Sequence, residues 1–224
     1  MNEYRSKYTL EELYPVWNSL SGSEREFLKE SATIVKIDAG KIIHDGGDEC
    51  EGLFIIASGL VRAYIMNDEG KEITVFRLFE RDMCMFSAPC ILNSIQFSIT
   101  IEAERDSILI MLDSARYKKL MESSVHVQKY TNELMATRFS EVMWLIEQIM
   151  WKSIDKRLAA FLSQEREIEN SCELTITHEK IASHLGTARE VVTRMLKYFQ
   201  AEGIVELKRR KILIINENKL NLLK

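Results

Sequence analysis

Apolar and polar residues alternate over short stretches through the first half of the chain, and these stretches are separated by turns rich in glycine and acidic residues. A period of two, with a turn about every eight to twelve residues, predicts the short strands of an antiparallel barrel or sandwich. We expect about 80 residues of this kind between 35 and 112. The expected strands are 41–43, 52–57, 61–66, 74–78, 97–103 and 107–112.

Helical patterns flank this region on both sides. Ahead of it, Ser21 and Glu24 have the spacing of a capping box that begins a short helix. After it, residues 124 to 150 contain no glycine or proline, and their apolar positions recur at alternating steps of four and three. This spacing is typical of a helix that packs along a second helix. The positions are Met135, Phe139, Val142, Ile146 and Ile149.

The long helix predicts a homodimer, because further apolar residues on its flanks widen its apolar surface beyond one stripe. At 1.5 Å per residue the helix is about 40 Å long. A helix buried wholly in its own chain is the alternative. We expect instead that the same helix of a second subunit covers the exposed face. Residues 151–155 then provide a hinge, with Ser153 as the cap of the next helix.

Two short helices separated by a glycine follow near the C-terminus. Thr177 is placed to cap the first helix and Gly186 to end it. Thr187 and Glu190 have the spacing of a second capping box, and the second helix has an apolar inner stripe. Its other face carries side chains of the types that pair with base edges and phosphates in a major groove. These are Thr187, Arg189, Glu190, Thr193, Arg194 and Lys197.

A predicted hairpin, with strands at 204–207 and 212–215, follows the second helix. Its tip carries four consecutive cations: Lys208, Arg209, Arg210 and Lys211. Crowding four positive charges is unfavourable unless an anion lies nearby, and a DNA backbone supplies one. The alternative is a solvated charged surface. We favour a winged helix-turn-helix that binds double-stranded DNA.

Charge is divided unevenly along the chain. From residue 153 onward there are 13 Lys and Arg against 10 Asp and Glu, a net charge of +3, whereas residues 1–152 carry 17 against 24, a net charge of −7. An acidic sensing part joined to a basic DNA-binding part accounts for this division. We expect an α+β chain with three parts: a sensing antiparallel β-barrel of jelly-roll type with short helices at 1–122, a dimerisation helix and hinge at 123–152, and the winged helix-turn-helix at 153–224.

Other classes of protein are disfavoured. No apolar run has the roughly twenty residues needed to cross a bilayer, and residues 1–14 have no signal-peptide pattern, so we expect a cytoplasmic protein with no membrane partner. Four scattered cysteines do not form a disulfide framework. The four histidines have no metal-ligand spacing and no nucleophile motif or phosphate loop is present, so we expect neither an enzyme nor a bound metal.

Barrel, long helix and winged helix-turn-helix together resemble the Crp/Fnr family of bacterial transcription regulators over nearly the whole chain. The most specific match is residues 186–194, GTAREVVTR, which is similar to the recognition helix of the family. The resemblance implies that Arg189, Glu190 and Arg194 contact bases of a palindromic operator. It also implies a homodimer, a small-molecule effector of unknown identity, and RNA polymerase as a partner. The acidic segment 165–173, which we expect to be a loop, is a candidate contact for RNA polymerase.

The effector pocket implied by the resemblance has an unusual composition. Relatives that bind cyclic nucleotides hold the phosphate with an arginine followed by serine or threonine. The aligned segments here, 86–88 (FSA) and 97–99 (FSI), contain no arginine, so cyclic AMP is not expected. No cysteine precedes Cys50, which argues against the iron-sulfur cluster of the oxygen-sensing relatives. The expected pocket residues are Cys84, Phe86, Ser87, Cys90, Phe97 and Ser98.

Three interpretations of this pocket remain. The first is that Cys84 and Cys90 are small apolar side chains that fill the barrel. The second is a thiol pair that senses oxidation or binds haem or a soft metal, for which His44 and Cys50 are further candidate ligands, although a histidine in a turn is usually solvated. The third is a site for an apolar or aromatic metabolite. The cofactor, if any, is unknown.

Overall fold

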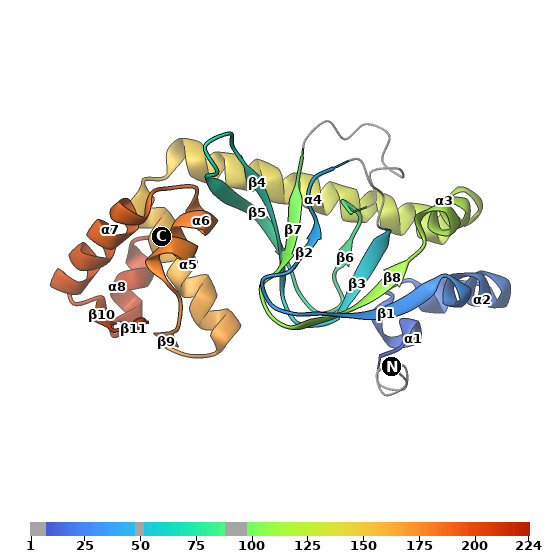
Figure 1. The fold of residues 1–224 in the computed structure, drawn as a ribbon, viewed down its shortest axis with the longest axis horizontal. Coiled ribbons are helices and arrows are strands. Elements are labelled where there is room, and N and C mark those ends of the chain that lie inside the picture. Colours follow the sequence, from blue (N-terminus) through green and yellow to red (C-terminus); the bar gives the residue numbers. More distant parts are fainter. Residues whose placement is uncertain (1–7, 48–51, 88–97) are drawn as a thin grey trace. The chain divides into compact units, whose positions relative to one another are not determined.

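The computed structural model describes residues 8–47, 52–87 and 98–224, so the predictions for Cys50, Cys90 and Phe97 lie outside it. Contacts divide the chain into two compact units. The first comprises Met1–Ile65 and Val75–Val142, and the second Met66–Thr74 and Met143–Lys224. Figure 1 shows the helices and strands, coloured in their order along the chain.

Two four-stranded antiparallel sheets form the β-barrel. One has the order β1-β8-β3-β6 and the other β2-β7-β4-β5. Their bounds are β1 Ala32–Ile37, β2 Ile42–His44, β3 Leu53–Ser58, β4 Val61–Met66, β5 Glu72–Leu78, β6 Met83–Cys84, β7 Thr100–Ala103 and β8 Ser107–Leu112. Short helical elements flank them: α1 Leu10–Leu13, η1 Trp17–Ser19, α2 Gly22–Glu30 and α3 Ser114–Ser123.

Alternation of side chains along the strands produces two cores. Phe54 and Ile56 of β3 point between the two sheets, where they meet Val61, Phe76 and Ile101. The intervening β3 residues, Leu53, Ile55 and Ala57, point to the opposite face of the sheet and pack against the short helices and the first half of the long helix. Every residue of β3 except Ser58 is therefore buried, which explains why this strand is continuously apolar in sequence.

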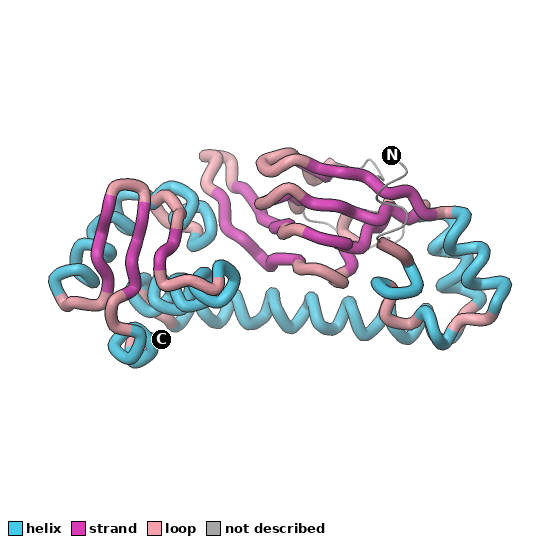
Figure 2. The backbone as a smooth tube through the Cα atoms, turned by 90° about the horizontal axis from the view of Figure 1, so that it is seen from below, coloured by secondary structure: helices cyan, strands magenta, loops and turns pink. Residues whose placement is uncertain are grey.

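The long helix α4 spans Val125–Trp151 without interruption (Figure 2). Its predicted bounds are correct to within one residue at each end. The next helix, α5, spans Ile154–Glu169 with Ser153 as N-cap, so the chain breaks helical geometry at the predicted hinge. None of the helices in the described ranges is long and apolar enough to cross a membrane.

The second unit contains the helix-turn-helix, α6 His178–Leu185 and α7 Arg189–Ala201, packed on α5. A three-stranded antiparallel sheet of order β10-β11-β9 packs on the same core. Its strands are β9 Glu173–Leu174, β10 Val205–Lys208 and β11 Lys211–Ile214. The chain closes with α8, Glu217–Leu222. The expected α+β class, with barrel, long helix and winged helix-turn-helix, is confirmed.

Two local predictions are wrong. Residues 165–173 are not a loop, because α5 continues to Glu169. The buried stripe of the helix extends through Phe161, Leu162 and Glu165, and Asn170, with φ of 48°, ends the helix. His44 is not a solvated turn residue: it is 3% exposed in β2, opposite Ile101 of β7.

Buried tyrosines join the helices of the first unit. The Tyr117 hydroxyl lies 3.4 Å from that of Tyr14 and 3.0 Å from Oγ1 of Thr131 on α4. Tyr130 meets the Tyr14 ring edge to face. Burial raises the pKa of the Tyr117 phenol, so this hydroxyl stays protonated and can donate.

Tyr117→Phe should lower the free energy of unfolding by about 1 kcal/mol, since the change leaves a buried hydroxyl on Thr131 without its partner and creates no cavity. Denaturant titration measures the difference. Tyr198→Phe is the matched control, because it removes the same hydroxyl from a residue that is 48% exposed. Equal stability of the Tyr117 and Tyr198 variants would contradict the importance of this contact.

Candidate nucleic-acid interface

The turn between α6 and α7 is set by backbone geometry. Thr177 caps α6 by accepting a hydrogen bond from the Lys180 amide at 3.1 Å. At the other end Gly186 adopts the left-handed conformation, with φ of 63°, which residues other than glycine seldom adopt. The Thr187 amide then donates to the Ala182 carbonyl at 3.1 Å and closes the end of α6.

This use of Thr187 makes one sequence prediction wrong. The N-cap of α7 is Ala188, with no side-chain cap, and not Thr187. Glu190 is consequently the second residue of the helix and not the third, so the predicted capping box does not form. Thr187 belongs to the turn that ends α6, a role that the spacing of Thr187 and Glu190 did not reveal.

Packing of α7 decides which of its residues face solvent. Val192, Leu196 and Phe199 are completely buried in the core shared with α5, α6 and the wing. The opposite face exposes Arg189, Glu190, Arg194 and Lys197, and leaves Thr187 and Thr193 partly exposed. All six residues predicted to contact DNA from this helix and its preceding turn thus keep access to solvent, and the core fixes the rotation of the helix.

Thr193 is oriented by two neighbours. Its hydroxyl donates to the Arg189 carbonyl at 2.9 Å and lies 2.9 Å from Nδ1 of His178, the first residue of α6. Burial and the Arg189 charge lower the pKa of His178. On sequence alone His178 is expected to pack or to touch phosphate, and its contact with Thr193 is not predicted, because this contact depends on how α6 crosses α7.

The wing separates its four cations into two pairs. Lys208 and Lys211 face each other at the end of the β10–β11 ladder, and each has a carboxylate partner. Lys208 lies 3.5 Å from Glu206, and Lys211 forms a hydrogen-bonded ion pair with Glu173 of β9. The hydrogen bond from Lys211 holds the pKa of Glu173 below its usual range.

Arg209 and Arg210 form the turn at the tip of the wing. Arg210 adopts a left-handed φ of 61°. Both side chains are exposed, and neither has a carboxylate within 4 Å among the residues that the structure describes. The tip therefore presents two cations that are not neutralised locally, whereas the two lysines at its base are.

The predicted effector residues are brought together only in part. Cys84, Phe86 and Ser87 are buried in the barrel, and Ser87 donates to the Gly52 carbonyl at 2.6 Å. Ser98 is exposed. Burial raises the pKa of the Cys84 thiol to about 11, which opposes formation of a thiolate. Within the described ranges, no three His, Cys, Asp or Glu side chains are arranged to hold a metal.

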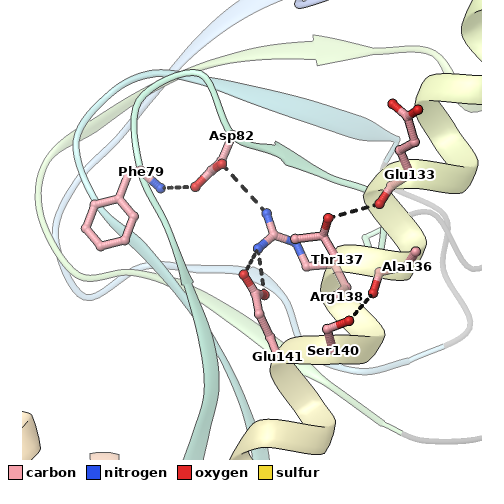
Figure 3. Close-up of polar contacts among 8 residues, drawn as sticks. All are labelled: Phe79, Asp82, Glu133, Ala136, Thr137, Arg138, Ser140 and Glu141. Atoms are coloured by element: carbon pink, nitrogen blue, oxygen red, sulfur yellow. Dashed lines mark hydrogen bonds and ion pairs between the residues drawn. The ribbon is translucent and has the colours of Figure 1, made fainter.

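A buried arginine, which sequence reasoning missed, attaches α4 to the barrel (Figure 3). Arg138 is 5% exposed and stacks its guanidinium 4.9 Å from the centre of the Phe76 ring. Nη1 donates to both carboxylate oxygens of Glu141, at 3.0 and 2.8 Å, and Nη2 lies 3.8 Å from Asp82. Asp82 also accepts a hydrogen bond from the Phe79 amide at 2.8 Å, which fixes its turn.

The predicted dimer residues of α4 differ in exposure. Phe139 is 66% exposed, Ile146 41% and Ile149 45%, whereas Met135 packs on both cores of the first unit and Val142 is half-buried. Met143, Trp144 and Met150 extend the exposed apolar surface. One end of the predicted seam thus serves the chain's own barrel, and the other end is uncovered in the single chain.

Known proteins match both parts of the chain. The family of cyclic nucleotide-binding domains matches residues 34–124, and that of Crp-like helix-turn-helix domains matches residues 156–223. The chain is 29% identical to the electron transport regulator A of Shewanella oneidensis over 84% of its length and 76% of the relative. It is also 29% identical to the fumarate and nitrate reduction regulatory protein of Vibrio cholerae, over 82% and 75%.

A solved structure agrees over almost the whole chain. It comes from Eubacterium rectale and is assigned to the Crp/Fnr family of transcriptional regulators. The two chains are 53% identical, with a TM-score of 0.92 and coverage of 95% of this chain and 98% of the other. The relatives are regulators of transcription and not enzymes. The chain belongs to the Crp/Fnr family of DNA-binding transcription regulators.

Proposed function

We propose that this chain is a sequence-specific transcription regulator that binds a palindromic operator as a homodimer and whose DNA affinity is controlled by a signal at the barrel. The observation that carries the proposal is the exposed face of α7, where Arg189, Glu190 and Arg194 project from a helix fixed by Val192, Leu196 and Phe199. We assign the sensing function to residues 1–122, dimerisation to 123–152 and DNA binding to 153–224.

Base recognition is assigned to the exposed face of α7. Arginine can bond guanine O6 and N7 in a bidentate manner, and glutamate can accept from cytosine N4, which suits Arg189, Arg194 and Glu190. Thr187, Thr193 and Lys197 lie on the same surface and complete the set. The wing cations, Lys208 to Lys211, are assigned to phosphates, with Arg209 and Arg210 as the principal contacts because their charges have no local partner.

The homodimer is proposed from the exposed half of the α4 seam. Large apolar side chains gathered on one helix are unfavourable in water, and a second copy of the helix would cover them. A dimer would present two α7 helices to successive major-groove faces, which matches a twofold-symmetric operator. From the same role we also propose RNA polymerase as a partner and a cytoplasmic location.

The signal is proposed to be a small molecule bound by the barrel, other than cyclic AMP. The described interior is lined by apolar and aromatic residues, including Phe76 and Phe86. A thiol, haem or metal sensor through Cys84 and Cys90 is the second candidate. The buried, protonated Cys84 favours the small molecule, because the thiolate is the reactive and metal-binding form.

Selection of bound sequences from random oligonucleotides, followed by affinity measurement, tests the base contacts. Arg194→Ala should weaken binding to the selected duplex by about 1 to 3 kcal/mol and relax preference at one base pair, since a bidentate base contact is lost. Arg209→Ala should weaken selected and unrelated duplexes equally and reduce the salt slope by about 1. Identical behaviour of the two variants on both duplexes would contradict the assignment, and failure to enrich any symmetric sequence would overturn the proposed function.

Glu173→Gln should strengthen binding to any duplex. The change removes the carboxylate that neutralises Lys211, so this cation becomes available to a phosphate, and the salt slope should steepen by about 1. Fluorescence anisotropy at several salt concentrations measures both quantities. Glu169→Gln removes the same charge from the end of α5 and is the control; equal gains in both variants would show a general charge effect and not release of Lys211.

Phe139→Glu should dissociate the dimer. Burial of a phenylalanine contributes about 1.5 to 3 kcal/mol, and two carboxylates would face each other across the twofold axis, so association should weaken at least about tenfold. Sedimentation velocity over a concentration series measures the change. Thr137→Glu adds the same charge to an exposed position on the opposite side of α4 and should leave association unchanged. A dimer unaffected by Phe139→Glu would place the interface elsewhere.

A further inference from the structure

His178 of α6 contacts the face of α7 that carries the proposed DNA contacts. Its ring is half-buried, and Nδ1 lies 2.9 Å from Oγ1 of Thr193, in the middle of the outward face of α7. Arg189, one helical turn earlier, is the charged group of α7 that acts on the ring. The charged residues next to it along its own helix are Glu179 and Lys180.

The hydrogen bonds determine which nitrogen of His178 carries the proton. A threonine hydroxyl has one hydrogen, and that of Thr193 is donated to the Arg189 carbonyl at 2.9 Å. Thr193 can therefore only accept from the ring, so Nδ1 must be the N–H of neutral His178. Nε2 is left with a lone pair, and it is the nitrogen that accepts the next proton.

We propose that Nε2 of His178 binds a DNA phosphate and takes up a proton from solvent when it does so. The inference rests on the proposed function, since it places one more residue in the same interface. A neutral Nε2 presents a lone pair that repels a phosphate oxygen, whereas protonated Nε2 donates a charge-assisted hydrogen bond. Thr193 holds the ring in both states, because Nδ1 keeps its hydrogen when Nε2 is protonated.

The direction of the pH dependence follows from the charges that act on the ring. In the free protein, burial and Arg189 lower the pKa of His178 from its ordinary value of 6.5, so the ring is neutral near pH 7. A phosphate at Nε2 stabilises the charged ring and raises this pKa in the complex. DNA affinity should therefore increase as pH falls through the pKa of the complex, and level off below that of the free protein.

Affinity for a selected duplex and for an unrelated duplex, measured at constant ionic strength between about pH 6 and about pH 7.5, tests the proposal. The wild-type chain should bind both more tightly at low pH, by up to about tenfold per pH unit within the window between the two pKa values. His178→Gln cannot be charged, and it should remove this component. His126→Gln, at the start of α4, should retain the full slope.

A spectroscopic measurement gives a second, independent result. Nitrogen chemical shifts of the free wild-type chain should identify His178 as the Nδ1–H tautomer at neutral pH, and Thr193→Val should abolish that preference by removing the acceptor. Addition of duplex DNA should move the titration midpoint of His178 to higher pH. The Nε2–H tautomer in the free chain, or an unchanged midpoint on DNA, would overturn the proposal.

Failure of the inference is distinguishable from failure of the proposed function. If the wild-type and His178→Gln chains both enrich and bind a selected duplex with the same pH slope, His178 is not a phosphate contact, and the regulator assignment stands. If the wild-type chain shows no preference for any sequence, the proposed function fails at an earlier step. A slope lost only in His178→Gln, on selected and unrelated duplexes alike, supports both.

Discussion

Burial of the inner stripe of α7 is the constraint on which the candidate interface depends. Val192, Leu196 and Phe199 have no exposed surface, and they lie in one core with α5, α6 and the β10–β11 hairpin. Because these three side chains fix the rotation of α7 about its axis, they also decide that Arg189 and Arg194 face outward. A polar residue in the stripe would therefore disturb DNA recognition without altering any residue proposed to contact DNA.

The net charge of the second unit does not show which of its cations are paired with carboxylates. The two lysines at the base of the wing lie beside Glu206 and Glu173, and leaving these half-exposed partners reduces their contribution to a DNA complex by a small amount. The arginines at the tip have no such cost. A run of four cations in sequence thus separates in space into a neutralised pair and an available pair, a distinction that only the register of the β10–β11 ladder reveals.

Sequence patterns predicted the architecture well because it follows from periodicity. β4 and β8 have the predicted bounds, α4 differs by one residue at each end, and Thr177 and Gly186 delimit α6 as expected. The failures concern contacts between distant segments. The spacing of Thr187 and Glu190 predicts that Thr187 caps α7, yet the Thr187 amide is bonded to the Ala182 carbonyl of α6. Similarly, His44 and Arg138 are polar residues buried by tertiary contacts, and nothing in their neighbours along the chain indicates burial.

Arg138 has a mechanical consequence that extends beyond its ion pairs. It lies thirteen residues before the end of α4, and at 1.5 Å per residue this segment is a rod of about 20 Å. Without glycine or proline to absorb bending, a tilt of about 5° at the barrel displaces the far end by about 2 Å. A change in the tilt of α4 where Arg138 meets the barrel would therefore become larger toward the C-terminal end of the helix.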